Sequence, residues 1–215
     1  MEHVHLQRVA PADIEARSME LIGQELGGRT FPADQAPVIK RCIHTSADFD
    51  YADNLAFSPG AVARGLEAIR GGCTIVTDTQ MAWSGVNKRV LEKFGGRAVC
   101  FMADPDVAAQ AKARGVTRAA VSMERAAGLE GTVVLAVGNA PTALVRAWEL
   151  MGEGKFSPAL VIGVPVGFVN VVESKQLILE SPVPHIVARG RKGGSNIAAA
   201  ICNALLYMAS HNERE

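Results

Sequence analysis

The clearest structural signal lies in residues 131–151, GTVVLAVGNAPTALVRAWELM. The run Thr132–Val137 is almost continuously apolar and rich in valine, which predicts a strand covered on both faces, as in a parallel sheet. A tight turn follows at Gly138, and Pro141 suits the first position of a helix, where its missing N–H would have no partner anyway. The stretch therefore predicts a strand, a turn and the helix Pro141–Met151 in direct succession.

The same alternation of short apolar runs and longer amphipathic segments extends over the chain. Further strands are predicted at Val38–His44, Cys73–Thr77, Ala98–Met102, Ala159–Val164 and Ile186–Arg189. Helices are predicted at Pro11–Leu26, Gly60–Arg70, Gln80–Phe94, Pro105–Arg114, Glu173–Leu179 and Ser195–Ser210, and Arg118 stands at the start of another. Such alternation forms βαβ units, so we expect an α/β fold, a three-layer αβα arrangement with a mainly parallel sheet. No linker or repeat divides the 215 residues, so residues 1–215 are expected to form a single domain.

Composition argues against several classes of protein. Lys+Arg and Asp+Glu number 22 each, and aromatic residues make up only 5%, so neither a net positive charge nor stacking residues favour nucleic acid. No apolar run approaches the roughly 20 residues that cross a bilayer, and the N-terminus lacks the apolar core of a signal peptide. Cys42, Cys73, Cys100 and Cys202 are too widely spaced for a metal site and are expected to be buried free thiols. We expect a cytoplasmic protein with no nucleic-acid and no membrane partner.

Ligands of open α/β sheets gather beyond the carboxyl ends of the strands. The unusual runs of this sequence fall at those ends: His44-Thr45-Ser46, Asp78 through Ser84, Asp104, Gly138 through Thr142, Pro165 through Phe168, and Gly190 through Asn196. Their convergence indicates a binding site at one edge of the sheet.

His44 is the candidate proton donor or acceptor of this edge. It is expected to close a strand at the rim of the sheet, and an imidazole there can exchange a proton near neutral pH. The neighbouring carboxylates Asp48, Asp50 and Asp53 are expected mainly to build turns and helix caps.

Two predicted helix starts have features of acid-binding sites. Asn139 could cap the helix after its turn, where exposed amides would face an anionic or carbonyl-bearing ligand; a plain strand-to-helix connection is the alternative. Arg189, Arg191 and Lys192 precede two glycines and a helix that Ser195 is expected to cap, so this run is a candidate cradle for acid groups. It matches neither GxxxxGK[ST] nor GxGxxG, which disfavours a nucleotide.

Three further polar residues complete the candidates. Arg118 stands at a helix start, where a basic side chain gains nothing from the helix dipole, so its position indicates a negatively charged partner. Ser18 and Ser84 are hydroxyls that could bond the polar edge of a ring; taken alone, each is an ordinary surface serine.

Together these runs resemble precorrin-8X methylmutase and its cobalt-precorrin-8 counterpart. The strings that carry the resemblance are RCIHTSADFD, FSPGAV, GNAPTAL, PVGFVNVVESK and GRKGGSNIAAAICNALL, and they cover nearly the whole chain. The resemblance implies a homodimeric α/β enzyme with no separate cofactor and no metal. It implies a 1,5-sigmatropic shift of a methyl group from C-11 to C-12 of a tetrapyrrole, precorrin-8X or cobalt-precorrin-8, in cobalamin biosynthesis.

The resemblance also places functional residues. The family's histidine corresponds to His44 as the catalytic residue, and residues that contact the substrate correspond to Ser18, Ser84 and Arg118. With the residues at the predicted strand ends and in the RCIHTS run, the predicted substrate-binding set is Ser18, Arg41, Ser84, Arg118, Asn139, Lys192 and Ser195.

Other classes of function stay open at this point. Cys42 and His44 would share a face of a strand, which permits a Cys–His hydrolase. A carrier that retains a tetrapyrrole without turnover is a second alternative, and a nucleotide-binding enzyme is a third. The sequence does not decide between a cobalt-free and a cobalt-containing ring.

Overall fold

A six-stranded sheet forms the centre of the computed structural model, which describes residues 6–211. The strands are β1 (Leu55–Phe57), β2 (Thr74–Thr77), β3 (Arg97–Val99), β4 (Val133–Val137), β5 (Leu160–Gly163) and β6 (His185–Ala188). Their spatial order is β1-β6-β5-β4-β2-β3. All neighbours are parallel except β1, which pairs antiparallel with β6 and places Ala56 opposite Val187. The predicted mainly parallel sheet is confirmed.

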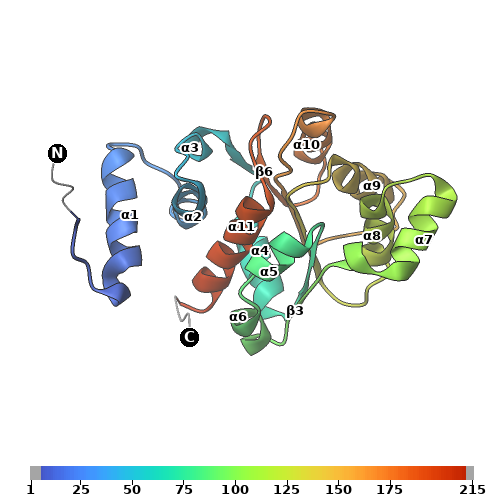
Figure 1. The fold of residues 1–215 in the computed structure, drawn as a ribbon, viewed down its shortest axis with the longest axis horizontal. Helices are drawn as coiled ribbons and strands as arrows, with labels where there is room; N and C mark the ends of the chain where they lie inside the picture. Colours follow the sequence, from blue (N-terminus) through green and yellow to red (C-terminus); the bar gives the residue numbers. More distant parts are fainter. Residues whose placement is uncertain (1–5, 212–215) are drawn as a thin grey trace.

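Helices cover both faces of this sheet (Figure 1). One face carries α2 (Ala36–Ser46), α4 (Ala61–Arg70), α5 (Gln80–Gly85), α6 (Lys88–Lys93) and α11 (Ser195–Ala209). The other carries α8 (Arg118–Ala127), α9 (Pro141–Gly152) and α10 (Val171–Leu179). At the two ends of the molecule, α1 (Ile14–Glu25) packs on α2 and α7 (Pro105–Arg114) packs on α8; the short helix α3 (Tyr51–Asn54) and the 3₁₀ turns Pro11–Asp13 and Phe101–Ala103 lie in connections. The three-layer αβα arrangement is confirmed.

The central strands are apolar throughout because both of their faces are buried. Every residue of β4 and β5 is buried, and Leu135 and Ile162 have no exposed surface. Removing a side chain of this size from water contributes roughly 1.5–3 kcal/mol. Among the described residues, no helix has both the length and the apolar character to span a membrane.

The predicted strand Val38–His44 is wrong, because this segment lies within helix α2. Its buried residues are Val38, Ile39, Cys42 and Ile43. They recur after three and four positions, which places them on one side of a helix that packs against α11. His44 therefore lies in the last turn of a covering helix and not at the rim of the sheet.

Two other differences concern the ends of elements. The predicted helix Gln80–Phe94 is two helices, because the chain leaves the helical path after Gly85 and the side chain of Asn87 caps a new helix by accepting from the N–H of Val90 at 3.1 Å. In place of Val38–His44, the sheet contains β1, an edge strand of three residues that no alternating pattern in the sequence predicted.

Candidate active site

The carboxyl ends of β2 and β4 are joined by Asp78, a fully buried carboxylate. Its oxygens accept hydrogen bonds from the main-chain N–H groups of Gly138 and Asn139, both at 2.8 Å, and of Ala140 at 2.6 Å. Burial raises the pKa of Asp78 above its ordinary range, and these N–H donors oppose the increase. Of the two alternatives for this turn, main-chain amides that face a ligand are excluded, because Asp78 already accepts from them. The predicted capping role of Asn139 is wrong, because the N-cap of α9 is Ala140 and no side chain caps this helix.

The residue after Asp78 ties the same place to α11. The hydroxyls of Thr79 and Ser195 lie 2.7 Å apart, and the Thr79 hydroxyl also accepts from the N–H of Ala82 at the start of α5. Ser195 is buried and is the first residue of α11, whose N-cap is Gly194, so its predicted capping role is wrong.

Gly138 allows this close approach of β4 to α11. A Cβ atom at Gly138 would lie 2.7 Å from Cα of Ser195 and 2.8 Å from the carbonyl oxygen of Gly194. Both are main-chain atoms, so a larger residue would require the helix start to move. The ends of β2, β4 and the start of α11 therefore form one packed unit.

A second buried ion, Lys175 of α10, holds the loop after β6. Its ammonium group donates to the carbonyl oxygens of Gly190 and Lys192, both at 2.8 Å. The side chain is 1% exposed, and burial lowers the pKa of Lys175 to about 8. The loop Gly190–Gly194 is therefore held in place by the buried amine of Lys175, which donates to two of its main-chain carbonyl oxygens.

Lys192 of the same loop reaches across to the segment that follows α2. Its Nζ lies 2.6 Å from Oδ2 of Asp48 and 2.6 Å from Oδ2 of Asp50. Hydrogen bonds to these carboxylates raise the pKa of Lys192, and the bond from Lys192 lowers the pKa of Asp48. Asp48 also accepts from the N–H of Asp50 at 3.0 Å, which agrees with its predicted role in a turn.

His44 is exposed in the last turn of α2, where the helix dipole favours a basic side chain. Arg41, one turn earlier, lies 2.6 Å from Oε1 of Glu15 and 5.2 Å from the centre of the Tyr207 ring. Ser18 of α1 donates its hydroxyl to the carbonyl oxygen of Ile14 at 2.8 Å. These residues form one group of candidates, on the paired helices α1 and α2.

Asn139, Ser84 and Arg118 form the other group, at the ends of β4, β2 and β3. All three are exposed. Within residues 6–211, the side chains of Asn139 and Ser84 make no hydrogen bond, and Arg118 donates from Nη1 to the carbonyl oxygen of Met102 at 3.2 Å. Their polar groups are available to a ligand.

The two groups belong to different covering helices. Figure 1 shows α2, which carries His44, and α8, which begins at Arg118, on opposite sides of α11. Lys192 lies with the His44 group through Asp48 and Asp50, and Ser195 lies with Asn139 through Thr79 and Asp78.

The Cys–His hydrolase is disfavoured by the same change of Val38–His44 from strand to helix. Residues two apart on a helix point in different directions, so Cys42 and His44 do not share a face. Cys42 has no exposed surface, and burial raises the pKa of its thiol well above the ordinary value, which suppresses the thiolate. The prediction of free thiols is confirmed; Cys73 and Cys202 are buried and Cys100 is half-buried.

Comparisons with known proteins agree with this fold and these motifs. Residues 13–208 match the family described as precorrin-8X methylmutase (CbiC). The chain belongs to the precorrin-8X methylmutase family. It is 45% identical to a cobalt-precorrin-8 methylmutase of Salmonella typhimurium over 92% of this chain and 95% of that protein. It is 43% identical to one of Priestia megaterium, over 94% of this chain and 89% of that protein.

Relatives of both names occur. A precorrin-8X methylmutase of Pseudomonas aeruginosa is 41% identical over 89% of this chain and 93% of that protein. The crystal structure of a precorrin-8X methylmutase from Thermus thermophilus superposes with a TM-score of 0.85 at 41% identity, covering 93% of this chain and 98% of that one. The methylmutase fold is therefore shared along nearly the full length.

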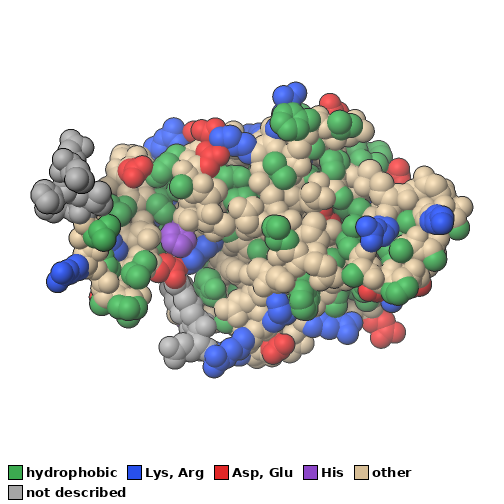
Figure 2. All heavy atoms as spheres, in the orientation of Figure 1, with side chains coloured by type: hydrophobic (Ala, Val, Ile, Leu, Met, Phe, Trp, Pro, Cys, Tyr) green, Lys and Arg blue, Asp and Glu red, His purple; other side chains and the backbone are tan. Residues whose placement is uncertain are grey.

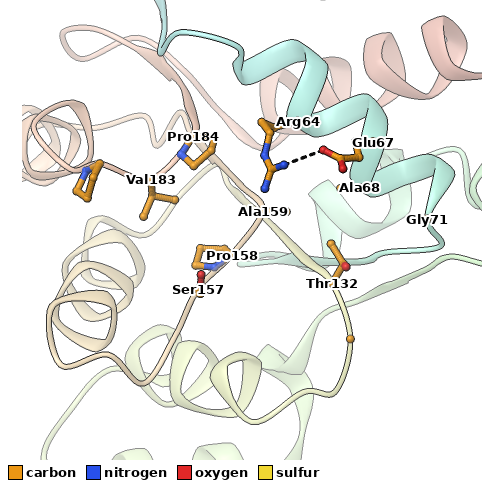
Figure 3. Close-up of a pocket in the computed structure, with 12 residues that line it drawn as sticks. Arg64, Glu67, Ala68, Gly71, Thr132, Ser157, Pro158, Ala159, Val183 and Pro184 are labelled. Atoms are coloured by element: carbon orange, nitrogen blue, oxygen red, sulfur yellow. Dashed lines mark hydrogen bonds and ion pairs between the residues drawn. The ribbon is translucent and has the colours of Figure 1, made fainter.

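Two crevices of this methylmutase chain are lined by residues other than the predicted site residues. One of about 590 Å³ opens at the amino ends of the strands, next to Thr132, Ala159 and the Arg64–Glu67 ion pair (Figure 3). Another, of about 700 Å³, lies between α8 and α9. Neither is lined by His44, Ser18 or Ser84.

Two charged residues of the site were not assigned a role from the sequence. From the sequence, Asp78 belongs only to the strand-end run Asp78 through Ser84, and Lys175 only to the motif PVGFVNVVESK. A lone acid directly after a buried strand and a lone lysine on an apolar helix face are the signals that could have marked them. Among residues 6–211, no group of three or more His, Cys, Asp or Glu side chains is arranged to hold a metal ion.

The buried amine of Lys175 predicts a pH dependence of stability. The folded protein has a pKa of about 8 for Lys175, whereas an unfolded lysine titrates near pH ~10.4. Between these values the unfolded chain binds more protons, so the contribution of Lys175 to the free energy of unfolding increases with pH. Relative to Lys175→Met, the free energy of unfolding of the wild type should increase by about 2 kcal/mol between about pH 7.5 and about pH 9.5, measured by urea unfolding.

Lys112→Met, at an exposed position of α7, provides the matched control, and its difference from the wild type should not change with pH. Equal pH profiles for wild type and Lys175→Met would contradict the assignment of the low pKa to Lys175.

Proposed function

We propose that this chain catalyses the intramolecular shift of a methyl group, from C-11 to C-12 of a precorrin-8X-type macrocycle, in cobalamin biosynthesis. The observation that carries the proposal is the family match over residues 13–208, together with the full-length relatives named methylmutase. In the reaction the bond from the methyl carbon to C-11 breaks as its bond to C-12 forms, so no atom is gained or lost overall.

The protein's part in such an isomerisation is to hold the ring and to assist with a proton. We propose that protonated His44 donates a hydrogen bond or proton to the conjugated ring as the methyl group migrates; because composition does not change, a transferred proton has to leave the ring again. Positioned acids of this kind contribute roughly 10²–10⁴-fold. The exposed, solvent-facing imidazole at the end of α2 is suited to receive its proton from water.

Binding of an acid-fringed ring by a protein without net charge requires local basic groups. Arg118, Arg189 and Arg191 are exposed, and Arg suits bidentate contacts with carboxylates. Lys192 contributes less free charge than the sequence suggests, because Asp48 and Asp50 already pair with it. Figure 2 shows acidic and basic side chains interspersed over one face of the molecule, so carboxylates would be held by particular arginines and not by a general positive surface.

We further propose that the chain acts as a homodimer whose site combines residues of both copies. This is supported by the positions of α2, which carries His44, and α8, which begins at Arg118, on opposite sides of α11 in Figure 1. The four unpaired cysteines favour a reducing compartment, and we propose that the reaction takes place in the cytoplasm.

The activity is tested by incubating the purified protein with the cobalt-free and the cobalt-containing ring and recording visible absorption spectra. Conversion of at least one form to the product spectrum, over many turnovers, is the expected result. A spectrum that changes only in proportion to the amount of protein would show retention without turnover, as in a carrier, and would reject the proposal.

His44→Ala should slow turnover by about 10²–10⁴-fold, because it removes the proposed acid, while the dissociation constant of the ring changes little. Turnover is measured at saturating ring concentration and binding by fluorescence or absorption titration. Thr45→Ala alters the exposed neighbour on the same helical turn and should behave as wild type. Undiminished turnover of His44→Ala would remove the histidine from the chemistry.

The shared site is tested by mixing two damaged chains. Arg118→Ala should chiefly weaken ring binding, so its turnover is low at ring concentrations below KM. If each site takes His44 from one copy and Arg118 from the other, a mixed dimer of His44→Ala and Arg118→Ala has one intact site and recovers activity. Without recovery in a dimer of confirmed composition, both residues would have to act within one chain.

A further inference from the structure

We infer that Asp78 is a positioning residue for this reaction: it holds the Gly138–Ala140 turn so that the side chain of Asn139 is presented to the ring. The inference rests on the proposed function, because the ring is the ligand that Asn139 would contact. Asp78 itself is buried and does not reach the substrate.

The contacts of Asp78 show what it fixes. Its two oxygens accept from three consecutive main-chain N–H groups, those of Gly138, Asn139 and Ala140, at 2.6–2.8 Å. Among residues 6–211 no lysine, arginine or histidine pairs with it, so its negative charge is offset by main-chain N–H groups, these three and its own. Three successive N–H groups can converge on one anion only if the main chain of the turn adopts one particular path, which sets the direction of the middle side chain.

Asn139 is that middle residue. It is exposed beyond the carboxyl end of β4, and its amide makes no hydrogen bond within residues 6–211. An amide can donate to a carboxylate of the ring and accept from a ring N–H, so it suits an acid-fringed macrocycle. A free amide on a turn that is held by a buried ion is an arrangement that a merely structural turn does not require.

The next residue extends the same constraint to the rest of the edge. Thr79 accepts from the start of α5, the helix of Ser84, and bonds Ser195 at the start of α11. Asp78 and Thr79 therefore connect the candidate residues Asn139, Ser84 and Ser195 to the end of one central strand. A displacement of this strand end would therefore change the position of each of these three residues.

Asp78→Asn provides the test, because it keeps the shape and replaces one oxygen by an NH₂ group. The side-chain NH₂ group would then face one of the three main-chain N–H groups. Two donors cannot bond each other, so the turn would move. We expect KM for the ring to rise about tenfold or more and kcat to change less than about threefold, as for the loss of a binding contact. Asn139→Ala should give the same pattern.

The double variant Asp78→Asn/Asn139→Ala separates positioning from general stability. If Asp78 acts through Asn139, adding Asn139→Ala to Asp78→Asn should raise KM by less than about twofold more. Leu150→Ala, buried in the last part of α9, loses core packing away from this edge and should leave KM unchanged.

The outcomes are distinct. Additive effects of the two substitutions, an Asp78→Asn protein with wild-type KM, or a Leu150→Ala protein with the same increase in KM would each overturn the inference. If Asp78→Asn does not fold, Asn139→Ala still decides, because an unchanged KM there removes the contact that Asp78 is inferred to position. A wild-type protein that converts neither ring form rejects the proposed function, and the inference with it.

Discussion

The carboxylate of Asp78 in its ring of main-chain N–H groups is the contact on which the carboxyl edge of the sheet depends. A buried ion usually has a counter-ion; here the donors are main-chain amides of the neighbouring strand's turn. Lys175 shows the same arrangement with the opposite charge: its buried ammonium group donates to two main-chain carbonyl oxygens of the loop after β6. In both, a charged group deep in the protein orders a loop through hydrogen bonds to its main chain and not to its side chains.

Much of this fold could be predicted because parallel strands that are buried on both faces appear in the sequence as continuous apolar runs. The segment around Val134–Val137 and the helix after Pro141 are local features, and the structure has them where the pattern indicated. The strand prediction for Val38–His44 was wrong for a different reason. Its apolar residues stand on either side of the polar pair Lys40 and Arg41, at the three- and four-residue spacing of a helix face, so the period itself indicated a helix. The error mattered, since it placed His44 at the sheet rim when it belongs to a covering helix.

The candidate site, like the fold, could be predicted from the sequence only in part. The motif resemblance identifies candidate residues but not the side chains that they contact, because those contacts join distant parts of the chain. Asp48 and Lys192 are 144 positions apart, and Thr79 and Ser195 are 116 apart. No local pattern reports such pairs. The sequence could also not show that α2 and α8 lie on opposite sides of α11, because that arrangement follows from how these helices pack on the two faces of the sheet.

The two outermost strands of the sheet have a consequence for solubility. β1 and β3 are each three residues long, so the sheet ends in short edges on both sides. Open edges are templates on which other chains can add strands and aggregate, and a parallel sheet with distant pairings is slow to assemble and exposed meanwhile. Edges this short offer few free backbone groups for such additions, and β3 also begins with the exposed, charged Arg97, which opposes the pairing of a further strand.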